Sequence, residues 1–325
     1  MRYKIWKITG WSVALLVAIF LWLTLFGLSS NQPGHVYNKG QNAVWIGHKW
    51  VGEYSGSGDV QKLVTTLKDN GFGTVFVHVG PLKSDGTIAP DKYKYVIDFL
   101  EKARTIDKTI KYQAWMGQVR GKINLSDESV RHNVSNLCMM MTYMIDFDGV
   151  HFDVEPVWDG DEDFIKTLGE CRTRVKAGTK ISVALAEYIP KSLIWMTSRF
   201  KEFKNYNTQV NYRNVGQYAD QIVTMTYDTG FEKSWTYRWL VREQVVGVTK
   251  LFKDKEVFIA IPAYDEKKDG FNPEIENVEN GMRGIINGLN NSRSREENFA
   301  GVAIYPFWEF DKDEITTYRK LWLNK

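Results

Sequence analysis

The chain has 325 residues, a length that suits one large domain or two small ones, and its formal charge is +3. The whole excess lies in Arg2, Lys4 and Lys7, because the rest of the chain has 39 basic and 39 acidic residues. Such a body has no basic surface for nucleic acid, and no nucleic-acid partner is expected.

An apolar stretch without charges covers residues 8–28, directly after these basic residues. As a helix it would be about 31 Å long, the thickness of a bilayer's hydrocarbon core. The preceding basic residues favour a cytoplasmic N-terminus. A cleaved signal peptide is the alternative, although its apolar region is usually shorter and residues 25–30 offer no clear cleavage site. We expect a basic stub at 1–7, a transmembrane anchor at 8–28, a linker at 29–40 and an extracytoplasmic domain at 41–325, which would be secreted if the leader is cleaved.

Short apolar runs then recur at a steady interval. They cover residues 43–46, 74–79, 112–116, 150–154, 181–186, 222–226, 257–261 and 302–305. Helical patterns fill the gaps. One helix is expected around residues 60–67, with Ser57 or Asp59 as its cap and Gly71 as its end, and another over residues 93–103.

Apolar strands that alternate with amphipathic helices indicate a parallel sheet covered on both faces. Eight such units predict an α/β fold, a closed (β/α)8 TIM barrel, with an open doubly wound sheet as the alternative. No glycine-rich phosphate loop follows the first run, which disfavours a nucleotide-binding version of that alternative.

The fourth run reads Asp-Gly-Val-His-Phe-Asp-Val-Glu from residue 148 to 155. In a strand, the two valines and the phenylalanine would face the helices, while His151, Asp153 and Glu155 would face the barrel interior. Glu155 ends the run, where barrel strands deliver side chains to an active-site rim. Asp153 and Glu155 are therefore a candidate general acid and its helper. A surface strand with solvated acids is the alternative, but the apolar face implies that the strand is covered.

The predicted strand ends carry more polar and aromatic side chains than stability requires. They are His48, Trp50, His78, Gln118, Glu155, Glu187, Tyr227, Asp228, Tyr264, Tyr305 and Trp308. We expect these residues to gather at one rim of the barrel.

Two motifs on these strands resemble those of glycoside hydrolase family 18, the chitinases and endo-β-N-acetylglucosaminidases. The family's DxxDxDxE motif is matched by Asp148, His151, Asp153 and Glu155, with histidine at the second acidic position. Its Met-x-Tyr-Asp motif is matched from Met225 to Asp228. The family's Ser-Gly-Gly stretch on the third strand is replaced by Trp-Met-Gly-Gln at residues 115–118, so this chain resembles a divergent member.

The resemblance implies retaining hydrolysis in which the substrate's own 2-acetamido group is the nucleophile. Glu155 would be the acid, Asp153 would stabilise the oxazolinium intermediate, and Tyr227 would align the acetamido carbonyl. Further substrate contacts are expected from Asp228, Met225, His151, Trp308, Tyr305, Trp158, Glu187 and Tyr264. His151 has three possible states: a neutral donor that orients Asp153, a cation that lowers the carboxyl pKa values, or a core histidine bonded inside the barrel.

Neither a metal nor a cofactor is expected. Cys138 and Cys171 form no metal motif. They fall on helices flanking the fourth strand, where they could pair but are expected to be free, buried thiols. The acidic run at residues 159–163 lacks calcium-loop spacing and suits a solvated helix start.

Three functions follow from these patterns. The first is a membrane-anchored glycosidase acting on a glycan that contains N-acetylglucosamine, such as peptidoglycan, chitin, an N-glycan or a surface polysaccharide. The second is a non-catalytic carbohydrate-binding barrel. The third is a metal-dependent hydrolase that uses His48, His78 and His151, although no His-x-His pair occurs.

Overall fold

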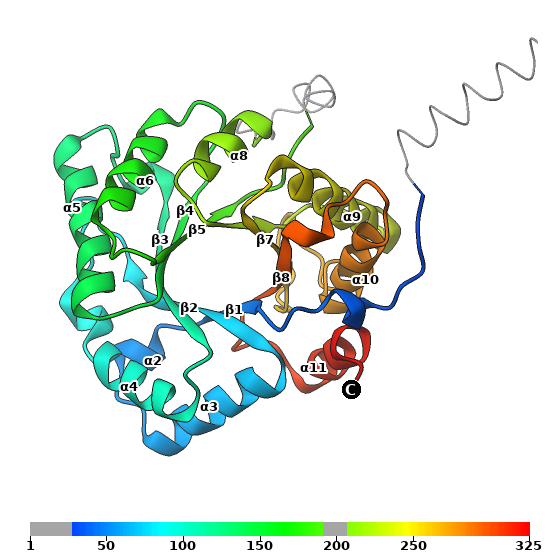
Figure 1. Cartoon of the computed structure of the whole chain (residues 1–325), viewed down its shortest axis with the longest axis horizontal. Coiled ribbons are helices and arrows are strands. Elements are labelled where there is room, and N and C mark those ends of the chain that lie inside the picture. Colours follow the sequence, from blue (N-terminus) through cyan, green and yellow to red (C-terminus); the bar gives the residue numbers. More distant parts are fainter. Residues whose placement is uncertain (1–27, 191–206) are drawn as a thin grey trace, which may run out of the picture.

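The computed structural model of the chain describes residues 28–190 and 207–325. Eight parallel strands close into a barrel in sequence order, and β8 pairs with β1. Figure 1 looks along the barrel, with helices in a ring around the strands. The strands are β1 (Asn42–Ile46), β2 (Phe72–Pro81), β3 (Lys111–Val119), β4 (Gly149–Glu155), β5 (Lys180–Leu185), β6 (Gln221–Met225), β7 (Glu256–Pro262) and β8 (Phe299–Tyr305).

Helices cover the outside of the barrel. The α-helices are α2 (Lys49–Gly52), α3 (Ser57–Asp69), α4 (Val96–Ile106), α5 (Glu128–Met139), α6 (Glu162–Arg174), α8 (Gln209–Gly216), α9 (Ser234–Leu251), α10 (Val278–Leu289) and α11 (Lys312–Tyr318). Short turns are η1 (Gly34–Tyr37), η2 (Pro90–Tyr93), η3 (Arg120–Lys122) and η6 (Glu296–Asn298), and η4 (Met140–Met144) and η7 (Arg319–Leu323) have π-helical geometry.

The closed barrel is confirmed, and each predicted run lies on one of its strands, in the predicted order. The open sheet is wrong. The runs were visible because barrel strands are buried on both faces and so contain few polar residues. Strand β1, for example, is buried along its whole length.

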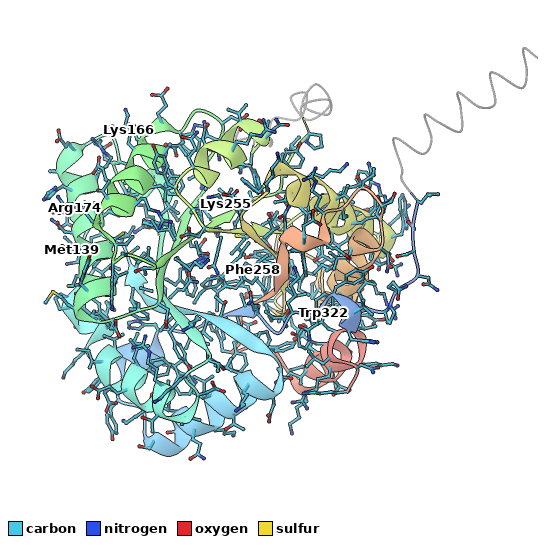
Figure 2. All side chains as sticks on the ribbon, viewed as in Figure 1. Met139, Lys166, Arg174, Lys255, Phe258 and Trp322 are labelled. Atoms are coloured by element: carbon cyan, nitrogen blue, oxygen red, sulfur yellow. The ribbon has the colours of Figure 1, made fainter. Side chains whose placement is uncertain are left out.

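The strands separate two apolar cores. One lies between the barrel and its helices, and includes Val150, Phe152 and Val154 of β4. The other fills the barrel interior, with Trp45, Phe76 and Phe258 among its members. In Figure 2, Phe258 lies on the ring of strands, whereas Met139, Lys166 and Arg174 lie at the molecule's outer edge. The interior is therefore a packed core and not an open channel.

The predicted helix boundaries were partly wrong. Helix α3 contains residues 60–67 and stops before Gly71, which has the predicted left-handed backbone with φ +69°. Its N-cap is Gly56, and neither Ser57 nor Asp59 caps it through a side chain. Helix α4 begins at Val96, because Tyr93 belongs to the preceding turn η2.

The N-terminal predictions have two outcomes. Apart from Leu28, the predicted transmembrane anchor lies outside the described residues, and within residues 28–190 and 207–325 no helix has the length and apolar character to cross a bilayer. Residues 29–40, predicted as a linker, are mostly exposed, but they are attached to the barrel at several points. Ser29 pairs with Asn291 as an antiparallel bridge, and a Cβ on Gly34 would clash with the Leu321 carbonyl oxygen.

The two cysteines are free thiols in the structure, as expected. Cys138 of α5 and Cys171 of α6 have no solvent exposure, and their sulfur atoms are 2.8 Å apart. The two thiols thus form a contact between neighbouring helices and are shielded from reagents in solution.

Candidate active site

Strand β4 delivers two carboxyl groups to the top of the barrel. Its inward residues, in order, are Gly149, His151, Asp153 and Glu155, and solvent exposure rises along them. His151 is fully buried, Asp153 is half-buried and Glu155 is exposed at the mouth. The strand therefore positions the carboxyl groups one above the other, with Glu155 accessible to a ligand.

Asp153 is held on one side and open on the other. Its Oδ2 accepts a hydrogen bond of 2.8 Å from the indole Nε1 of Trp115 on β3. Its Oδ1 is buried and has no hydrogen-bond partner among the described residues. A Cβ on Gly117, the register partner of Asp153, would lie 3.3 Å from the Trp115 nitrogen, so the glycine leaves room for the indole. An unpartnered carboxylate oxygen at this point is available to a donor from a ligand.

The two carboxyl groups divide into an acid and a charged partner. Although the Glu155 side chain is exposed at the mouth, the protein around its carboxyl group partly desolvates it. This desolvation, and next the negative charge of Asp153, raise the pKa of Glu155 well above its ordinary value. Burial also raises the pKa of Asp153, but its interaction with the Glu155 side chain, and next the hydrogen bond from Trp115, oppose this effect. Because both interactions stabilise ionised Asp153, while the Asp153 charge disfavours ionised Glu155, Glu155 is the group that keeps a proton near neutral pH.

The segment after β6 brings a phenol beside the carboxyl groups. Burial, followed by the charges of Glu155 and Asp153, raises the pKa of Tyr227 well above its ordinary value, so this hydroxyl remains a hydrogen-bond donor. The next residue, Asp228, has a left-handed backbone with φ +59°. Its carboxylate accepts hydrogen bonds from the Tyr264 hydroxyl at 2.7 Å and the Lys268 ammonium at 3.0 Å.

These side chains line one pocket of about 270 Å³. Its lining is Asp153, Glu155, Tyr227, Asp228, Tyr264, Glu266, Lys268, Tyr305, Pro306, Trp308 and Glu309. The rings of Tyr227 and Tyr305 are stacked, with centroids 5.8 Å apart, and Trp308 is 49% exposed beside Tyr305. The pocket thus combines carboxyl groups with a partly exposed aromatic wall.

Seven of the predicted site residues line this pocket: Asp153, Glu155, Tyr227, Asp228, Tyr264, Tyr305 and Trp308. The prediction missed Glu266, Lys268, Pro306 and Glu309, and it missed Trp115 beneath them. The signal for Trp115 was its place on the third predicted strand; the structure shows that it lies opposite His151 in the register.

Four predicted contacts lie elsewhere. His151 is a core residue: its Nε2 accepts from Trp45 Nε1 at 3.1 Å, its Nδ1 lies 2.8 Å from the Ser182 hydroxyl, and burial lowers its pKa well below the ordinary value. It is therefore neutral, and neither the cationic reading nor contact with Asp153 is correct. Met225 packs in the barrel core.

Trp158 and Glu187 also lie outside the pocket lining. The Arg120 guanidinium lies 5.6 Å from the Trp158 ring. Glu187 follows β5, and burial, with a further contribution from Glu276, raises its pKa to about 7. Both sit on the upper rim, but the pocket is formed by the connections after β4, β6, β7 and β8.

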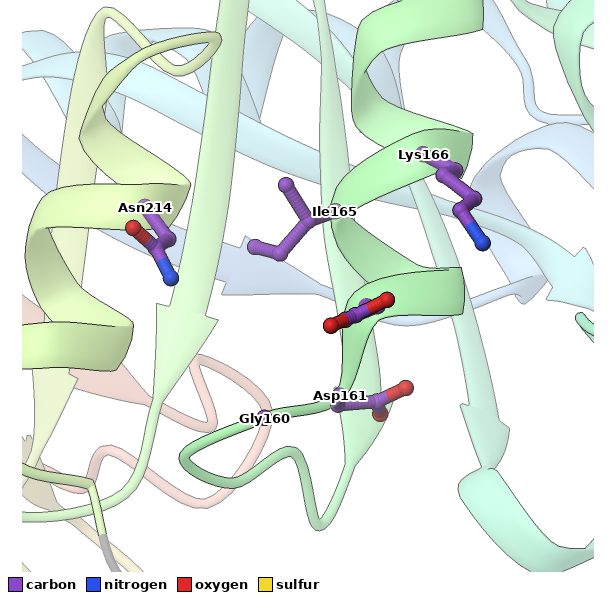
Figure 3. A pocket seen from close by; sticks show the side chains of 6 residues that line it. Gly160, Asp161, Ile165, Lys166 and Asn214 are labelled. Carbon is purple, nitrogen blue, oxygen red and sulfur yellow. The ribbon is translucent and has the colours of Figure 1, made fainter.

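A second depression of about 220 Å³ lies between α6 and α8. In Figure 3, Ile165 and Asn214 point into the gap between the helices, and Asp161 lies at the start of α6. Asp161 accepts two hydrogen bonds of 2.8 Å from Arg120, and it caps α6 through the Phe164 N–H. The acidic run thus begins a helix, as predicted, but Asp161 is buried and paired with Arg120 and not solvated. Within the described ranges, no group of three or more His, Cys, Asp or Glu side chains is placed to hold a metal ion.

No protein-family model matches the chain, and no curated protein matches it by sequence. Solved structures do match. The spore cortex-lytic enzyme SleL of Bacillus cereus has a TM-score of 0.58 at 12% identity, over 86% of this chain and 73% of that one. A family GH18 chitinase of Cycas revoluta, solved with allosamidin, has a TM-score of 0.58 at 14% identity, over 86% and 98%.

A mutant of the plant class V chitinase of Cycas revoluta in complex with (GlcNAc)3 gives a TM-score of 0.59 at 12% identity, covering 87% of this chain and 99% of that one. These likenesses cover 86–87% of this chain, at 12–14% identity. The chain therefore has the fold of these chitinases and of SleL.

Proposed function

We propose that this chain is a glycosidase that cleaves glycans containing N-acetylglucosamine by substrate-assisted, retaining catalysis. The observation that carries the proposal is the trio at the pocket floor. Glu155 keeps a proton, Asp153 presents an unpartnered buried oxygen, and Tyr227 presents a hydroxyl that stays protonated. Substrate-assisted hydrolysis requires an acid, a group for the acetamido N–H and a donor for the acetamido carbonyl.

In the first step, Glu155 donates its proton to the glycosidic oxygen as the bond from that oxygen to the anomeric carbon breaks. The acetamido carbonyl oxygen bonds to the anomeric carbon and closes an oxazolinium ring. Asp153 Oδ1 accepts the acetamido N–H, and its negative charge stabilises the cation. In the second step, water attacks the anomeric carbon from the opposite face, and the Glu155 carboxylate takes its proton.

Trp115 supports this proposal in a position where the family places a small residue. Its indole N–H bonds Asp153 Oδ2, which fixes the carboxylate and leaves Oδ1 for the substrate. His151 is neutral and hydrogen-bonded to Trp45 and Ser182, so it places no positive charge beside Asp153 and Glu155. We assign to Trp115 the role of holding Asp153 ionised and oriented.

The aromatic wall supports a sugar ligand. Pyranose faces pack on flat rings, and Trp308 and Tyr305 offer such surfaces beside the carboxyl groups. One structural neighbour was solved with (GlcNAc)3. The proposed ligand is thus an oligo- or polysaccharide that contains N-acetylglucosamine.

The proposed location is the outer surface of the cell membrane. It rests on the sequence of residues 1–28. Three basic residues there precede an uncharged apolar stretch that, as a helix, is long enough to span a bilayer. The barrel would then act on extracytoplasmic glycans.

Glu155→Gln tests the proposal. The amide keeps the shape of the side chain but cannot donate an acidic proton, so kcat on N-acetylglucosamine oligomers should fall at least about 10²-fold, while oligomer binding persists. Products are measured by mass spectrometry and binding by calorimetry. Glu309→Gln, a carboxyl group lining the same pocket, is the matched control and should keep most of the activity.

Three outcomes would contradict the proposal. Glu155→Gln activity above about a tenth of wild type would remove the general acid. Wild-type protein that binds oligomers without cleaving them would be a carbohydrate-binding barrel. Loss of activity on chelation would indicate the metal-dependent alternative.

Matched oligomers of glucose, which lack the acetamido group, should not be cleaved.

A further inference from the structure

The first described residues are fixed to the connection between α10 and β8. The Leu28 N–H donates to the Ser292 hydroxyl at 2.9 Å, and the Ser292 N–H donates to the Leu28 carbonyl at 2.8 Å. The Ser30 N–H donates to the Asn290 carbonyl at 2.8 Å. The chain therefore joins the barrel at this connection as soon as the apolar stretch ends.

The Asn290 side chain strengthens this attachment. Its Oδ1 accepts from the Gln32 N–H at 2.7 Å, from the Tyr37 hydroxyl at 3.1 Å and from the Ser30 hydroxyl. Its Nδ2 donates to the Gln32 carbonyl at 2.9 Å. One amide thus bonds three residues of the segment 28–37, which we call the docked segment. Little free chain separates the barrel from the predicted anchor.

The docked segment and the pocket lie at opposite ends of the barrel. It contacts the residues that precede β8, whereas Tyr305, which ends β8, lines the pocket. Seven strand residues at about 3.3 Å each separate the two ends by roughly 20 Å. In Figure 1 the docked segment, in blue, lies beside α10 and α11. We call the end of the barrel where the strands begin the base.

A second feature of the base lies across the barrel from the docked segment. Tyr143 and Met144 end η4, shortly before β4 begins, and are 59% and 74% exposed. Strand β4 lies four places from β8 in the closed ring of eight. An exposed tyrosine side chain suits the level of the lipid headgroups. The docked segment and Tyr143 thus lie on opposite sides of the base.

We infer that the barrel stands with its base against the lipid surface and its pocket facing away from it. The inference rests on the membrane-anchored glycosidase proposed above, and it adds the orientation of the barrel relative to the membrane. With the apolar stretch that precedes the docked segment in the bilayer, the docked segment leaves no slack for the barrel to turn its pocket toward the headgroups. The substrate is then a polysaccharide strand held outward from the membrane, and not a glycan attached to a lipid headgroup.

Energy transfer to the membrane tests the orientation in the full-length protein. Lys253→Cys places a thiol on the base, in the connection before β7, and Ser84→Cys places one near the pocket end, after β2. Both positions are exposed, while Cys138 and Cys171 are fully buried, so a maleimide donor labels only the new thiol. The protein is placed in phosphatidylethanolamine and phosphatidylglycerol vesicles with a headgroup acceptor.

Energy transfer from the label at Lys253→Cys should be at least about twice that from the label at Ser84→Cys, because the two labels are separated by the height of the barrel. Equal transfer, or greater transfer from Ser84→Cys, would overturn the orientation alone. Protein that does not float with the vesicles would overturn the anchor and the orientation together, and hydrolysis of soluble oligomers would show that the glycosidase assignment stands independently.

Asn290→Ala tests whether the docked segment sets the orientation. The substitution is combined with each of the two cysteine variants, and removing the amide should reduce the difference in energy transfer between their labels. Asn290→Asp keeps an acceptor oxygen and should preserve most of that difference. Asn290→Ala with an undiminished difference would remove the docked segment from the inference. Both variants should hydrolyse soluble oligomers at the wild-type rate, because residue 290 lies at the end of the barrel opposite the pocket.

Discussion

At the level of single residues, the hydrogen bond from Trp115 to Asp153 favours a charged Asp153 and a protonated Glu155. Both Asp153 and Glu155 are raised in pKa by burial, so burial alone would not separate their roles. The indole hydrogen bond is made to Asp153 and stabilises its ionised form. Glu155 lacks this bond and feels the Asp153 charge, so it holds the proton.

Trp115→Phe removes this bond while keeping most of the ring volume. A hydrogen bond to a charged group contributes about 1.5–3 kcal/mol, so kcat should fall roughly 10- to 100-fold. The pKa of Asp153 should rise, and because ionised Asp153 is needed, the acidic limb of the kcat–pH profile should move to higher pH. The pH profile of oligomer hydrolysis measures both effects.

Trp45→Phe is the matched control, since Trp45 donates to His151 and not to Asp153. Its acidic limb should coincide with that of the wild type. An unchanged limb in Trp115→Phe, or an equal shift in both variants, would show that the indole does not control the charge of Asp153.

The sequence predicted the polar groups of β4 correctly but not their partners. Alternation within one strand fixes which side chains face inward, so Asp153 and Glu155 could be identified. Whether an inward histidine reaches the ligand depends on groups from other strands. Trp45 and Ser182, on β1 and β5, bind His151 and hold it in the core. Such contacts depend on barrel register, which a single sequence does not give.

At the level of elements, the connections after β6 and β7 form one wall of the pocket. Glu276, immediately before the N-cap of α10, is fully buried, and its carboxylate accepts from the Thr229 N–H at 3.2 Å and from the Thr229 hydroxyl at 3.0 Å. Thr229 follows Asp228, which has the left-handed backbone. Glu276 therefore fixes the segment that carries Tyr227 and Asp228.

Glu276→Ala should loosen this wall, because it leaves the Thr229 N–H without its partner. Losing a buried hydrogen bond of this kind costs about 1–3 kcal/mol, which should lower both the free energy of unfolding and kcat. Glu276→Gln keeps an acceptor oxygen and should recover most of kcat. Denaturant unfolding and oligomer hydrolysis measure the two quantities, and an equal loss of kcat in both variants would contradict the positioning role.

The sequence revealed strands better than connections. Strands β1 to β8 are buried on both faces and therefore stand out as apolar runs. The connection after β7 is polar, and Lys268 reaches the pocket only because Asp228 and Tyr264 bind it there. The docked segment was missed for a similar reason. Its attachment uses hydrogen bonds to residues near 290, which leave no periodic pattern in the sequence.

At the level of the whole molecule, several buried carboxyl groups couple stability to pH. Burial raises the pKa of Glu276 and of Glu187 to about 7, and of Glu314 to about 8. Asp107 behaves oppositely: hydrogen bonds from Thr109 lower its pKa to about 2. The first group opposes folding when ionised, whereas Asp107 supports folding when ionised.

The sign of the pH dependence follows from proton binding. Between pH 4.5, the ordinary glutamate value, and pH 7 to 8, the folded protein binds more protons than the unfolded chain at Glu276, Glu187 and Glu314. The free energy of unfolding therefore falls as pH rises through this window. The Asp107 contribution is present above pH 3.8 and is lost as pH falls toward 2. Maximum stability is expected near pH 4 to 5.

The free energy of unfolding at pH 5 should thus exceed that at pH 8, with fully buried Glu276 alone contributing roughly 2 kcal/mol of the difference. Denaturant unfolding of the full-length protein at the two pH values measures it. Glu276→Gln, which cannot ionise, should reduce the difference by that amount, whereas Glu309→Gln at the exposed pocket rim should leave it unchanged. A wild-type protein equally stable at both pH values would show that these buried carboxyl groups do not govern its stability.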